Sequence, residues 1–502
     1  MTDTPAEAAW SALAAAAPRK LTDLFAAEPD RLSRMVVEAA GLRFDWSKTH
    51  MDAGLLAGFA KVADAMDLAG KRDALFAGEA VNASEGRAAT HTAERGQGSP
   101  DAVATASALH ERMRALIDAI EADALGPVRH ILHLGIGGSA LGPDLLVDAL
   151  GRASDRYDVA VVSNIDGASL EQALAQFDPH ATLIVIASKT FTTAETLLNA
   201  RSALGWMAEA EVEDPYGRLI ALTAAPDKAI EFGIDETRVL PFADSVGGRY
   251  SLWSSIGFPA ALALGWDAFA ELLEGAGAMD RHFRFAAVHE NAPVLAAFVD
   301  LYYARVRGAE TRAVFAYDER LRLLASYLQQ LEMESNGKSV AADGEPISGP
   351  TAPIVWGGVG TDAQHAVFQL LHQGTHLVPV EFVAVVEPGH TLHPEHHEQL
   401  LINCFAQGAA LMAGRASDDP ARSYAGDRPS STILLERLDP ASLGALLAFY
   451  EHKTFVFAAL LGINPFDQFG VELGKSIARE IAGGEGARFD SSTEALMERA
   501  LG

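Results

Sequence analysis

Cysteine is nearly absent from this 502-residue chain, and cationic residues are scarce relative to anionic ones. The single cysteine, Cys404, lies in the apolar run LLINCFAQGAALM, where we expect it to pack as a small hydrophobic side chain. It excludes a disulfide within the chain. The 39 Lys and Arg residues face 67 Asp and Glu residues, which gives a formal net charge of −28. A charge of this sign repels nucleic acid and anionic membranes, so we expect neither as a partner.

The N-terminal segment MTDTPAEAAWSALAAAAPRK lacks the basic start of a secretory signal, and its apolar run is too short to cross a membrane. We therefore expect a cytoplasmic protein. Apolar residues make up 49% of the chain and charged residues 21%, which excludes disordered and fibrous proteins. A chain of this length is expected to form more than one domain.

From about residue 130, short apolar runs alternate with helical stretches. The first set of expected strands is HILHLG and residues 157–163, 181–187 and 217–223, and the second set is 313–317, 353–356 and 377–386. Because alternating strands and helices form parallel sheets, the pattern predicts an α/β fold with two doubly wound, mostly parallel sheet domains. Helical extensions are expected at both ends of the chain.

The expected division of the chain has four parts. These are a helical N-terminal part (1–100) packing on the larger domain, a smaller sheet domain (101–275), a larger one (276–480) and a tail (481–502). The helical assignment of residues 1–95 comes from apolar residues at helical spacing: Leu55, Phe59, Val62 and Met66. Within it, Arg87 and His91 are expected to share a helical face and to form a structural salt-bridge cluster.

The third expected strand runs into a turn rich in hydroxyl groups, SKTFTTAET, and then into a helix. Ser188, Thr190, Thr192 and Thr193 place hydroxyls and backbone N–H groups at that helix N-terminus, which is typical of an anion-binding site. Lys189 adds a positive charge. The alternative is that the Ser and Thr side chains only cap the helix.

A glycine-rich turn, Gly135 to Ala140, follows the first expected strand and fits the dinucleotide pattern G-x-G-x-x-A. Asp166 ends the next strand, where a ribose-binding acid would lie. Spacing alone therefore leaves an NAD-dependent dehydrogenase open. The neighbouring hydroxyl-rich turn instead suits a terminal phosphate monoester, so a sugar phosphate fits better.

Two acidic residues compete for a catalytic role near the end of one expected helix. Glu334 falls where Asn336-Gly337 terminates that helix, which would place its carboxylate at a domain edge. Glu332 is the competitor, and either residue could simply be a solvated surface acid.

Other candidates depend on local patterns. The sequence Thr361 to Gln364 has the form of a capping box, which would place His365 in the first turn of a helix and favour its neutral form. A buried structural histidine is the alternative. Lys475 shares a helical face with apolar residues, where snorkelling is the alternative. Arg249 follows two glycines, a position suited to binding an oxyanion.

A histidine-rich segment invites a metal-binding interpretation: His390, His393, His396 and His397. It has no H-E-x-x-H spacing and no nearby cysteine ligand, so we expect no metal.

Several long motifs together resemble the signature segments of the glucose-6-phosphate isomerase family. These are GGRYSLWSSIG, LEMESNGKS, GTDAQHAVFQLLHQGTH and INPFDQFGVELGKSIA, with GIGGSALGP and SKTFTTAET as phosphate-side turns. The resemblance covers nearly the whole chain in the family order. Mild departures, among them Pro465 and Phe469, affect loop positions.

The resemblance implies a role for each matching residue. Glu334 would be the proton-shuttling base, His365 and Lys475 the ring-opening residues, Arg249 the oxyanion partner, and Glu195 the carboxylate that orients the histidine. The implied substrate contacts are Gly138, Ser139, Ser188, Lys189, Thr190, Thr193, Gln330 and Gln468.

The activity implied by the resemblance is the reversible interconversion of glucose 6-phosphate and fructose 6-phosphate, in glycolysis and gluconeogenesis, without a cofactor. It also implies a homodimer in which His365 reaches the partner's site. A regulator that senses sugar phosphates is a non-enzymatic alternative, but it would need a DNA-binding segment, and the sequence shows no basic helix-turn-helix.

Overall fold

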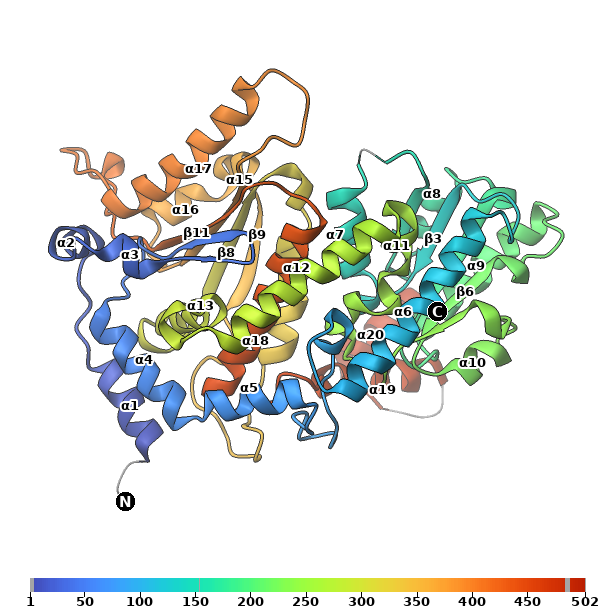
Figure 1. The fold of residues 1–502 in the computed structure, drawn as a ribbon, viewed down its shortest axis with the longest axis horizontal. Coiled ribbons are helices and arrows are strands. Elements are labelled where there is room, and N and C mark those ends of the chain that lie inside the picture. Colours follow the sequence, from blue (N-terminus) through green and yellow to red (C-terminus); the bar gives the residue numbers. More distant parts are fainter. Residues whose placement is uncertain (1–3, 153, 484–487, 502) are drawn as a thin grey trace. The chain divides into compact units, whose positions relative to one another are not determined.

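The computed structural model describes residues 4–152, 154–483 and 488–501. The chain separates into two compact units, Met1–Pro465 and Phe466–Gly502. The first unit contains two β-sheets, and the second contains short helices (Figure 1).

The smaller sheet has five parallel strands in the order β4-β3-β5-β6-β7. Its strands are β3 (His130–Leu134), β4 (Asp158–Val162), β5 (Thr182–Ala187), β6 (Leu219–Thr223) and β7 (Val239–Pro241). All six residues of β5 are buried, because this apolar strand lies in the middle of the sheet. The strand order reverses between β3 and β5, and ligands of such sheets bind outside the carboxyl ends at that point.

The larger sheet has six strands in the order β1-β2-β11-β10-β8-β9. Its parallel part is formed by β8 (Thr311–Tyr317), β9 (Ile354–Val359), β10 (Val380–Val385) and β11 (Ser430–Leu435). The strand order in this part reverses between β8 and β10, as it does between β3 and β5 in the smaller sheet. The expected α/β class with two doubly wound sheets is thus confirmed.

The expectation that residues 1–95 are helical is wrong first at residues 36–45. Strands β1 (Val36–Ala39) and β2 (Leu42–Asp45) form an antiparallel hairpin, and β2 pairs with β11. The two turn residues Ala40 and Gly41 both have positive φ, as the tight hairpin turn requires. The N-terminal part therefore extends the larger sheet instead of only packing against it.

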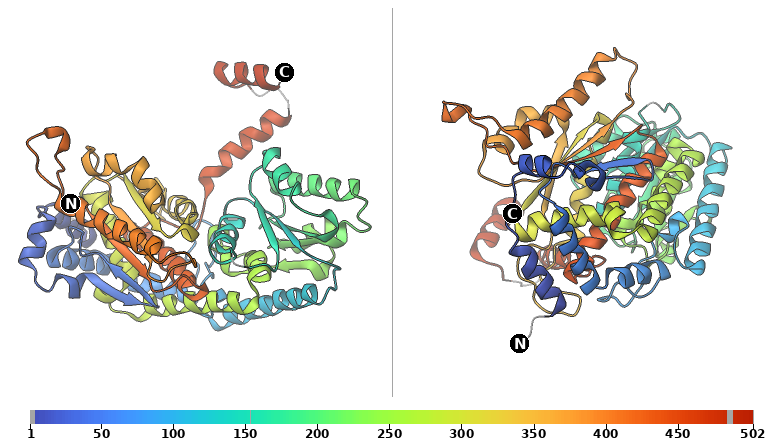
Figure 2. Two further views of the ribbon diagram at one scale, coloured as in Figure 1. Left: turned by 90° about the horizontal axis from the view of Figure 1, so that it is seen from above. Right: turned by 60° about the vertical axis from the view of Figure 1, so that its left-hand side comes forward.

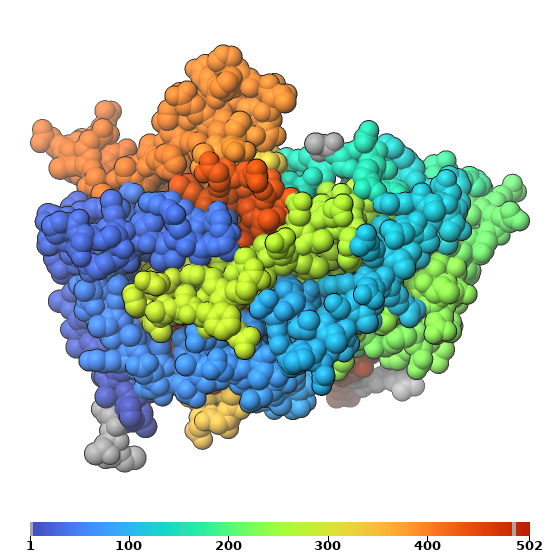
Figure 3. All heavy atoms as spheres, in the orientation of Figure 1, coloured from blue at the N-terminus to red at the C-terminus, as the bar shows by residue number. Residues whose placement is uncertain are grey.

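Helices surround both sheets (Figures 1 and 2). Around the smaller sheet these are α6 (Pro100–Glu121), α7 (Leu141–Leu150), α8 (Gly167–Leu174), α9 (Ala194–Glu209), α10 (Pro226–Glu231) and α11 (Phe258–Leu264). With the larger sheet lie α13 (Ala292–Leu301), α14 (Leu324–Leu328), α15 (Gly360–Ala366), α16 (Phe368–Gln373) and α17 (Glu395–Ala413). The N-terminal helices are α1 (Pro5–Ala14), α2 (Leu21–Ala27), α3 (Arg31–Met35), α4 (Ala53–Ala65) and α5 (Leu68–Ala77). In Figure 3 this N-terminal part covers the left and lower surface of the molecule.

Two long helices pack together in the centre of the first unit, α12 (Trp266–Phe285) and α18 (Pro440–Leu461). Asp439 and Ser442 start α18 with a capping box. Among the described residues, α18 is the one helix long and apolar enough to cross a membrane, but its apolar window is completely buried inside the fold. It is therefore the core helix of this unit.

Two further sequence expectations are wrong. Residues 82–92 contain no helix, so Arg87 and His91 share no helical face: Arg87 bonds with Glu85 and Asp244, and His91 packs on Tyr250. The expected salt-bridge cluster is nevertheless present at Arg87. The sequence also predicts that the last hundred residues return to helix, which is wrong because they contain β11.

The second unit contains a short turn, η13 (Phe469–Val471), and two helices, α19 (Glu472–Gly483) and α20 (Ser491–Leu501). Neither helix buries a side chain within the described residues. Several of its apolar side chains are exposed: Phe469, Val471, Leu473, Ile477, Leu496 and Leu501.

Candidate active site

The hydroxyl-rich turn lies at the carboxyl end of β5, at the point where the strand order of the smaller sheet reverses. Ser188 and Thr193 share a hydrogen bond of 2.9 Å between their hydroxyls, and Thr190 and Thr192 share one of 2.8 Å. Thr193 is the N-cap residue of α9, yet its side chain makes no capping hydrogen bond. Phe191, within the turn, has a left-handed backbone conformation with a φ of 50°. The hydroxyls therefore gather at a helix N-terminus without serving as caps.

The ammonium group of Lys189 is not a free cation, because it is bonded to the segment 244–246. Its ammonium group donates to the carbonyls of Asp244 (2.5 Å) and Val246 (3.1 Å) and pairs with the Asp244 carboxylate at 3.2 Å. Burial and the neighbouring Arg87 lower the pKa of Lys189. The lysine thus anchors the segment that leads to Gly247-Gly248-Arg249.

A second lysine lies at the turn and was missed by the sequence analysis. Exposed Lys228, in α10, donates from Nζ to the carbonyl of Thr190 at 3.3 Å. Because α10 follows β6, the next strand of the sheet, its first residues lie beside the turn after β5. The order of the strands was the signal that could have found it.

The glycine turn after β3 lies against the segment that carries Arg249. A Cβ atom on Gly138 would collide with the backbone of Gly248 and Arg249, and one on Gly137 would lie 2.8 Å from the amide nitrogen of Gln330. The carbonyl of Ser139 bonds with the ring of His133 at 2.6 Å. These glycines are thus explained by close contacts within the protein. A dinucleotide site is not needed to explain these glycines, and Asp166, the residue expected to bind a ribose, caps α8.

Arg249 and Glu334 are brought together. Arg249 is a buried residue of the turn η6 (Gly248–Trp253), and Glu334 ends the π-helical turn η11 (Gln329–Glu334) that continues α14. The Arg249 Nη1 atom lies 3.8 Å from a Glu334 carboxylate oxygen. The Glu334 side chain is 23% exposed, so it can be reached by a ligand. The Nη2 atom of Arg249 donates to the carbonyl of Pro465, a backbone contact that the departure at this position leaves intact.

Glu332 lies two residues earlier in the same turn, and its interpretation as a solvated acid is wrong. It is 4% exposed and pairs with Arg312 and, at 3.1 Å, with Lys453. These partners also bind Asp300 and Glu381 in a fully enclosed ion cluster. Glu332 is therefore a core residue, whereas Glu334 faces a ligand-accessible space.

His365 is exposed on α15, and the expected capping box is not formed. The helix starts at Gly360 with Val359 as N-cap, which puts His365 in the last turn, where the argument for a neutral ring from the helix N-terminus does not apply. His365 makes no hydrogen bond or ion pair with other described residues. Glu195 lies in the first turn of α9 and makes no hydrogen bond or ion pair with His365 within the described part of the chain.

Lys475 and Gln468 belong to the second unit. Lys475 is 58% exposed and pairs with Glu472 at 3.0 Å on the surface of α19. It does not snorkel over a buried apolar stripe, because no α19 residue is buried. Gln468 is exposed just before η13.

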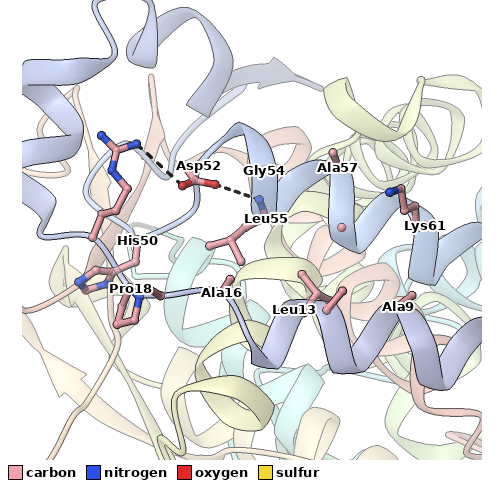
Figure 4. A pocket seen from close by; sticks show the side chains of 14 residues that line it. Ala9, Leu13, Ala16, Pro18, His50, Asp52, Gly54, Leu55, Ala57 and Lys61 are labelled. Carbon is pink, nitrogen blue, oxygen red and sulfur yellow. Dashed lines mark hydrogen bonds and ion pairs between the residues drawn. The ribbon is translucent and has the colours of Figure 1, made fainter.

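Two other features of the described residues are the histidine-rich segment and a cavity near the N-terminal helices. The four histidines of residues 390–397 do not form a cluster able to hold a metal, and no other group of described His, Cys, Asp and Glu residues does. A cavity of about 320 Å³ lies between α1 and α4, with Leu13, His50 and Lys61 in its walls (Figure 4). None of the candidate catalytic residues lines it.

The sequence profile described as phosphoglucose isomerase matches residues 45–497. The chain belongs to the phosphoglucose isomerase family.

Relatives and solved structures support this assignment along the whole chain. The glucose-6-phosphate isomerase of Rhizorhabdus wittichii is 71% identical, with 99% of this chain and 100% of that protein covered. The enzyme of the same name from Zymomonas mobilis is 64% identical, with 99% and 98% covered. The crystal structure of a glucose-6-phosphate isomerase from Chlamydia trachomatis superposes with a TM-score of 0.90 at 31% identity and covers 99% of both chains.

Proposed function

We propose that the chain is a glucose-6-phosphate isomerase, which interconverts glucose 6-phosphate and fructose 6-phosphate. The observation that carries the proposal is the approach of the Glu334 carboxylate to the buried Arg249. The segment that leads to Arg249 is bonded through Lys189 to the hydroxyl-rich turn. The high identity to proteins that bear this name over the full length of the chain supports the same substrate.

In the proposed cycle the phosphate binds first at the turn 188–193. The hydroxyls of Ser188, Thr190 and Thr193 and the N-terminus of α9 supply donors and a positive dipole end for the dianion. Gly138 and Ser139 lie at the neighbouring turn and Gln330 borders it, which supports their proposed role as sugar contacts. Lys189 acts there by holding the 244–246 segment.

The sugar ring must then open, which needs an acid at the ring oxygen and a base at the anomeric hydroxyl. We assign this work to His365 and Lys475. Support comes from their exposed side chains: the His365 ring makes no bond within the described residues, and the Lys475 ammonium is paired only on the surface. Glu195 is proposed to orient the histidine and Gln468 to contact the substrate.

Isomerisation follows by proton transfer. The Glu334 carboxylate removes the proton from C2, the electron pair forms the C1–C2 double bond, and negative charge moves onto O1. The guanidinium of Arg249 stabilises this enediolate because it is held beside the base in advance. The carboxylic acid returns its proton to C1 while the hydroxyl proton of O2 passes to O1, which leaves a ketone at C2. No cofactor enters this scheme.

We further propose a homodimer in which His365 completes the partner's site. The helix that carries His365, α15, contacts α16 and α17, which carry the exposed apolar residues Leu370, Ile402 and Phe405. The amide of Gln364 bonds to Asn403, which ties α15 to α17. An exposed apolar surface beside an exposed candidate catalytic residue is suited to a second copy of the chain.

The proposed domain division remains 1–100, 101–275, 276–480 and 481–502, and the proposed location is the cytoplasm. The two sheets support the division, since β3–β7 lie within residues 130–241 and β8–β11 within 311–435. A single buried cysteine suits a reducing compartment.

The proposal is tested by incubating the purified chain with glucose 6-phosphate in the presence of a chelator and without NAD, and then quantifying fructose 6-phosphate after quenching. We expect product to accumulate to an equilibrium reached from either sugar phosphate. Absence of product, or a nicotinamide absorbance change with glucose 6-phosphate and NAD alone, would contradict the proposal and favour the dehydrogenase.

A further inference from the structure

The hydroxyl of Ser335 lies between two groups of the arginine segment. The Nε atom of Arg249 donates to Ser335 Oγ at 2.6 Å, and Ser335 Oγ also bonds with the Tyr250 hydroxyl at 2.9 Å. Ser335 is 0% exposed, so no water competes for these bonds. Guanidinium nitrogens only donate, so the serine oxygen must accept from Arg249.

Ser335 itself is firmly placed. It directly follows Glu334 in the chain, and the next residue, Asn336, donates its side-chain amide to the carbonyl of Thr454 in the core helix α18 at 3.1 Å. The backbone that carries Glu334 and the hydroxyl that binds Arg249 are therefore parts of one fixed turn. The residue next to the base in the chain therefore also bonds to the arginine.

The separation matters for the proposed chemistry. An arginine in full contact with Glu334 would stabilise the carboxylate and weaken it as a base, and it would turn its donors toward the carboxylate instead of the substrate. The observed Arg249–Glu334 distance of 3.8 Å is wider than a charge-assisted hydrogen bond of about 2.7–2.9 Å. The bond from Nε to Ser335 opposes the collapse of the guanidinium onto the base.

We propose that Ser335 is a positioning residue that, with Tyr250, holds Arg249 at a working distance from Glu334 so that the guanidinium stabilises the enediolate. This inference rests on the proposed isomerase function. Ser335 touches no reacting atom in this scheme and acts only through Arg249.

Ser335→Ala tests it, with Ser255→Ala as the matched control. Ser255 is also buried near this segment, but its hydroxyl donates to the carbonyl of Leu240 and has no link to Arg249. We expect Ser335→Ala to lower kcat on the order of 10- to 100-fold, the effect of losing a hydrogen bond to a charged group, with KM changed by less than about threefold. Ser255→Ala should leave kcat within about twofold.

A second readout separates positioning from general damage. A phosphorylated hydroxamate whose planar anion mimics the enediolate should lose affinity for Ser335→Ala by about the same factor as kcat falls, whereas inhibition by inorganic phosphate should not change. Tyr250→Phe removes the Tyr250 hydroxyl and leaves Ser335 in place. Its fold-losses of kcat and of hydroxamate affinity should be roughly a third to a tenth of those of Ser335→Ala, again with phosphate inhibition unchanged.

Several outcomes would overturn the inference. Unchanged kcat in Ser335→Ala, or equal losses of affinity for the hydroxamate and for inorganic phosphate, would show that the serine does not position Arg249. If wild type itself forms no fructose 6-phosphate, the proposed function fails instead. Wild-type activity therefore distinguishes the two failures.

Discussion

The ion cluster around Glu332 gives a prediction that separates stability from catalysis. Glu332→Gln keeps the size of the side chain and an acceptor oxygen but removes the charge that pairs with Arg312 and Lys453. Two cations there face three carboxylates, those of Asp300, Glu332 and Glu381, so the formal charge of the cluster changes from −1 to zero.

The expected cost follows from burial. Removing one partner of a buried ion pair costs about 3–5 kcal/mol of unfolding free energy. Glu332→Gln keeps an acceptor oxygen and leaves balanced charges, so we expect it to cost about 2–3 kcal/mol. The matched control is Glu38→Gln, because Glu38 pairs with Arg43 at 2.8 Å but is 73% exposed. An exposed pair is worth at most about 1 kcal/mol, so the control should be nearly silent.

The assay is thermal or urea unfolding of each variant together with kcat at a temperature below the transition. We expect Glu332→Gln to lower the unfolding midpoint clearly and to keep kcat within about threefold of wild type, because Glu332 does not face the site. An unchanged midpoint with kcat reduced more than about 100-fold would refute this reasoning and move the catalytic base from Glu334 to Glu332.

The remaining predictions concern the site. Thr190→Ala combined with Thr193→Ala should raise KM and weaken inhibition by inorganic phosphate, and unchanged phosphate inhibition would show that the anion binds elsewhere. Arg249→Ala should lower kcat by about 10²- to 10³-fold, as for loss of an oxyanion donor; steady-state kinetics that show mainly a KM effect would contradict its role. If inactive Glu334→Gln and inactive His365→Ala chains are unfolded together and refolded, activity should return to roughly a quarter of wild type, because half the dimers are mixed and each has one intact site. No recovery, with mixed dimers shown by differential tags, would mean that His365 serves its own chain.

Local sequence patterns predicted most of the fold correctly. Apolar runs such as residues 181–187 identified β5 within one residue, because a buried parallel strand needs no distant information to be recognised. The hairpin of β1 and β2 was missed because its stability depends on pairing with β11, about 390 residues later in the chain. A pattern read locally cannot supply that contact.

The site shows the same limit. The family resemblance identified Glu334 and Arg249 as candidates, and the structure places Arg249 Nη1 3.8 Å from a carboxylate oxygen of Glu334. The burial of Glu332 depends on Arg312 and Lys453, and the hydrogen bond of Ser335 depends on Arg249, all of which are distant in sequence. The capping box before His365 failed because Val359, at the end of β9, already caps the helix two residues before Thr361.

The most direct test of the account follows deuterium during isomerisation in heavy water. If Glu334 carries the proton between C2 and C1, its carboxylic acid can exchange with solvent, and NMR should detect deuterium at C1 of fructose 6-phosphate formed by wild type. Glu334→Gln should keep the fold and the affinity for inorganic phosphate while turnover and deuterium incorporation both fall by on the order of 10²-fold or more. Full conversion by wild type with no deuterium in the product, or undiminished turnover by Glu334→Gln, would contradict the central claim.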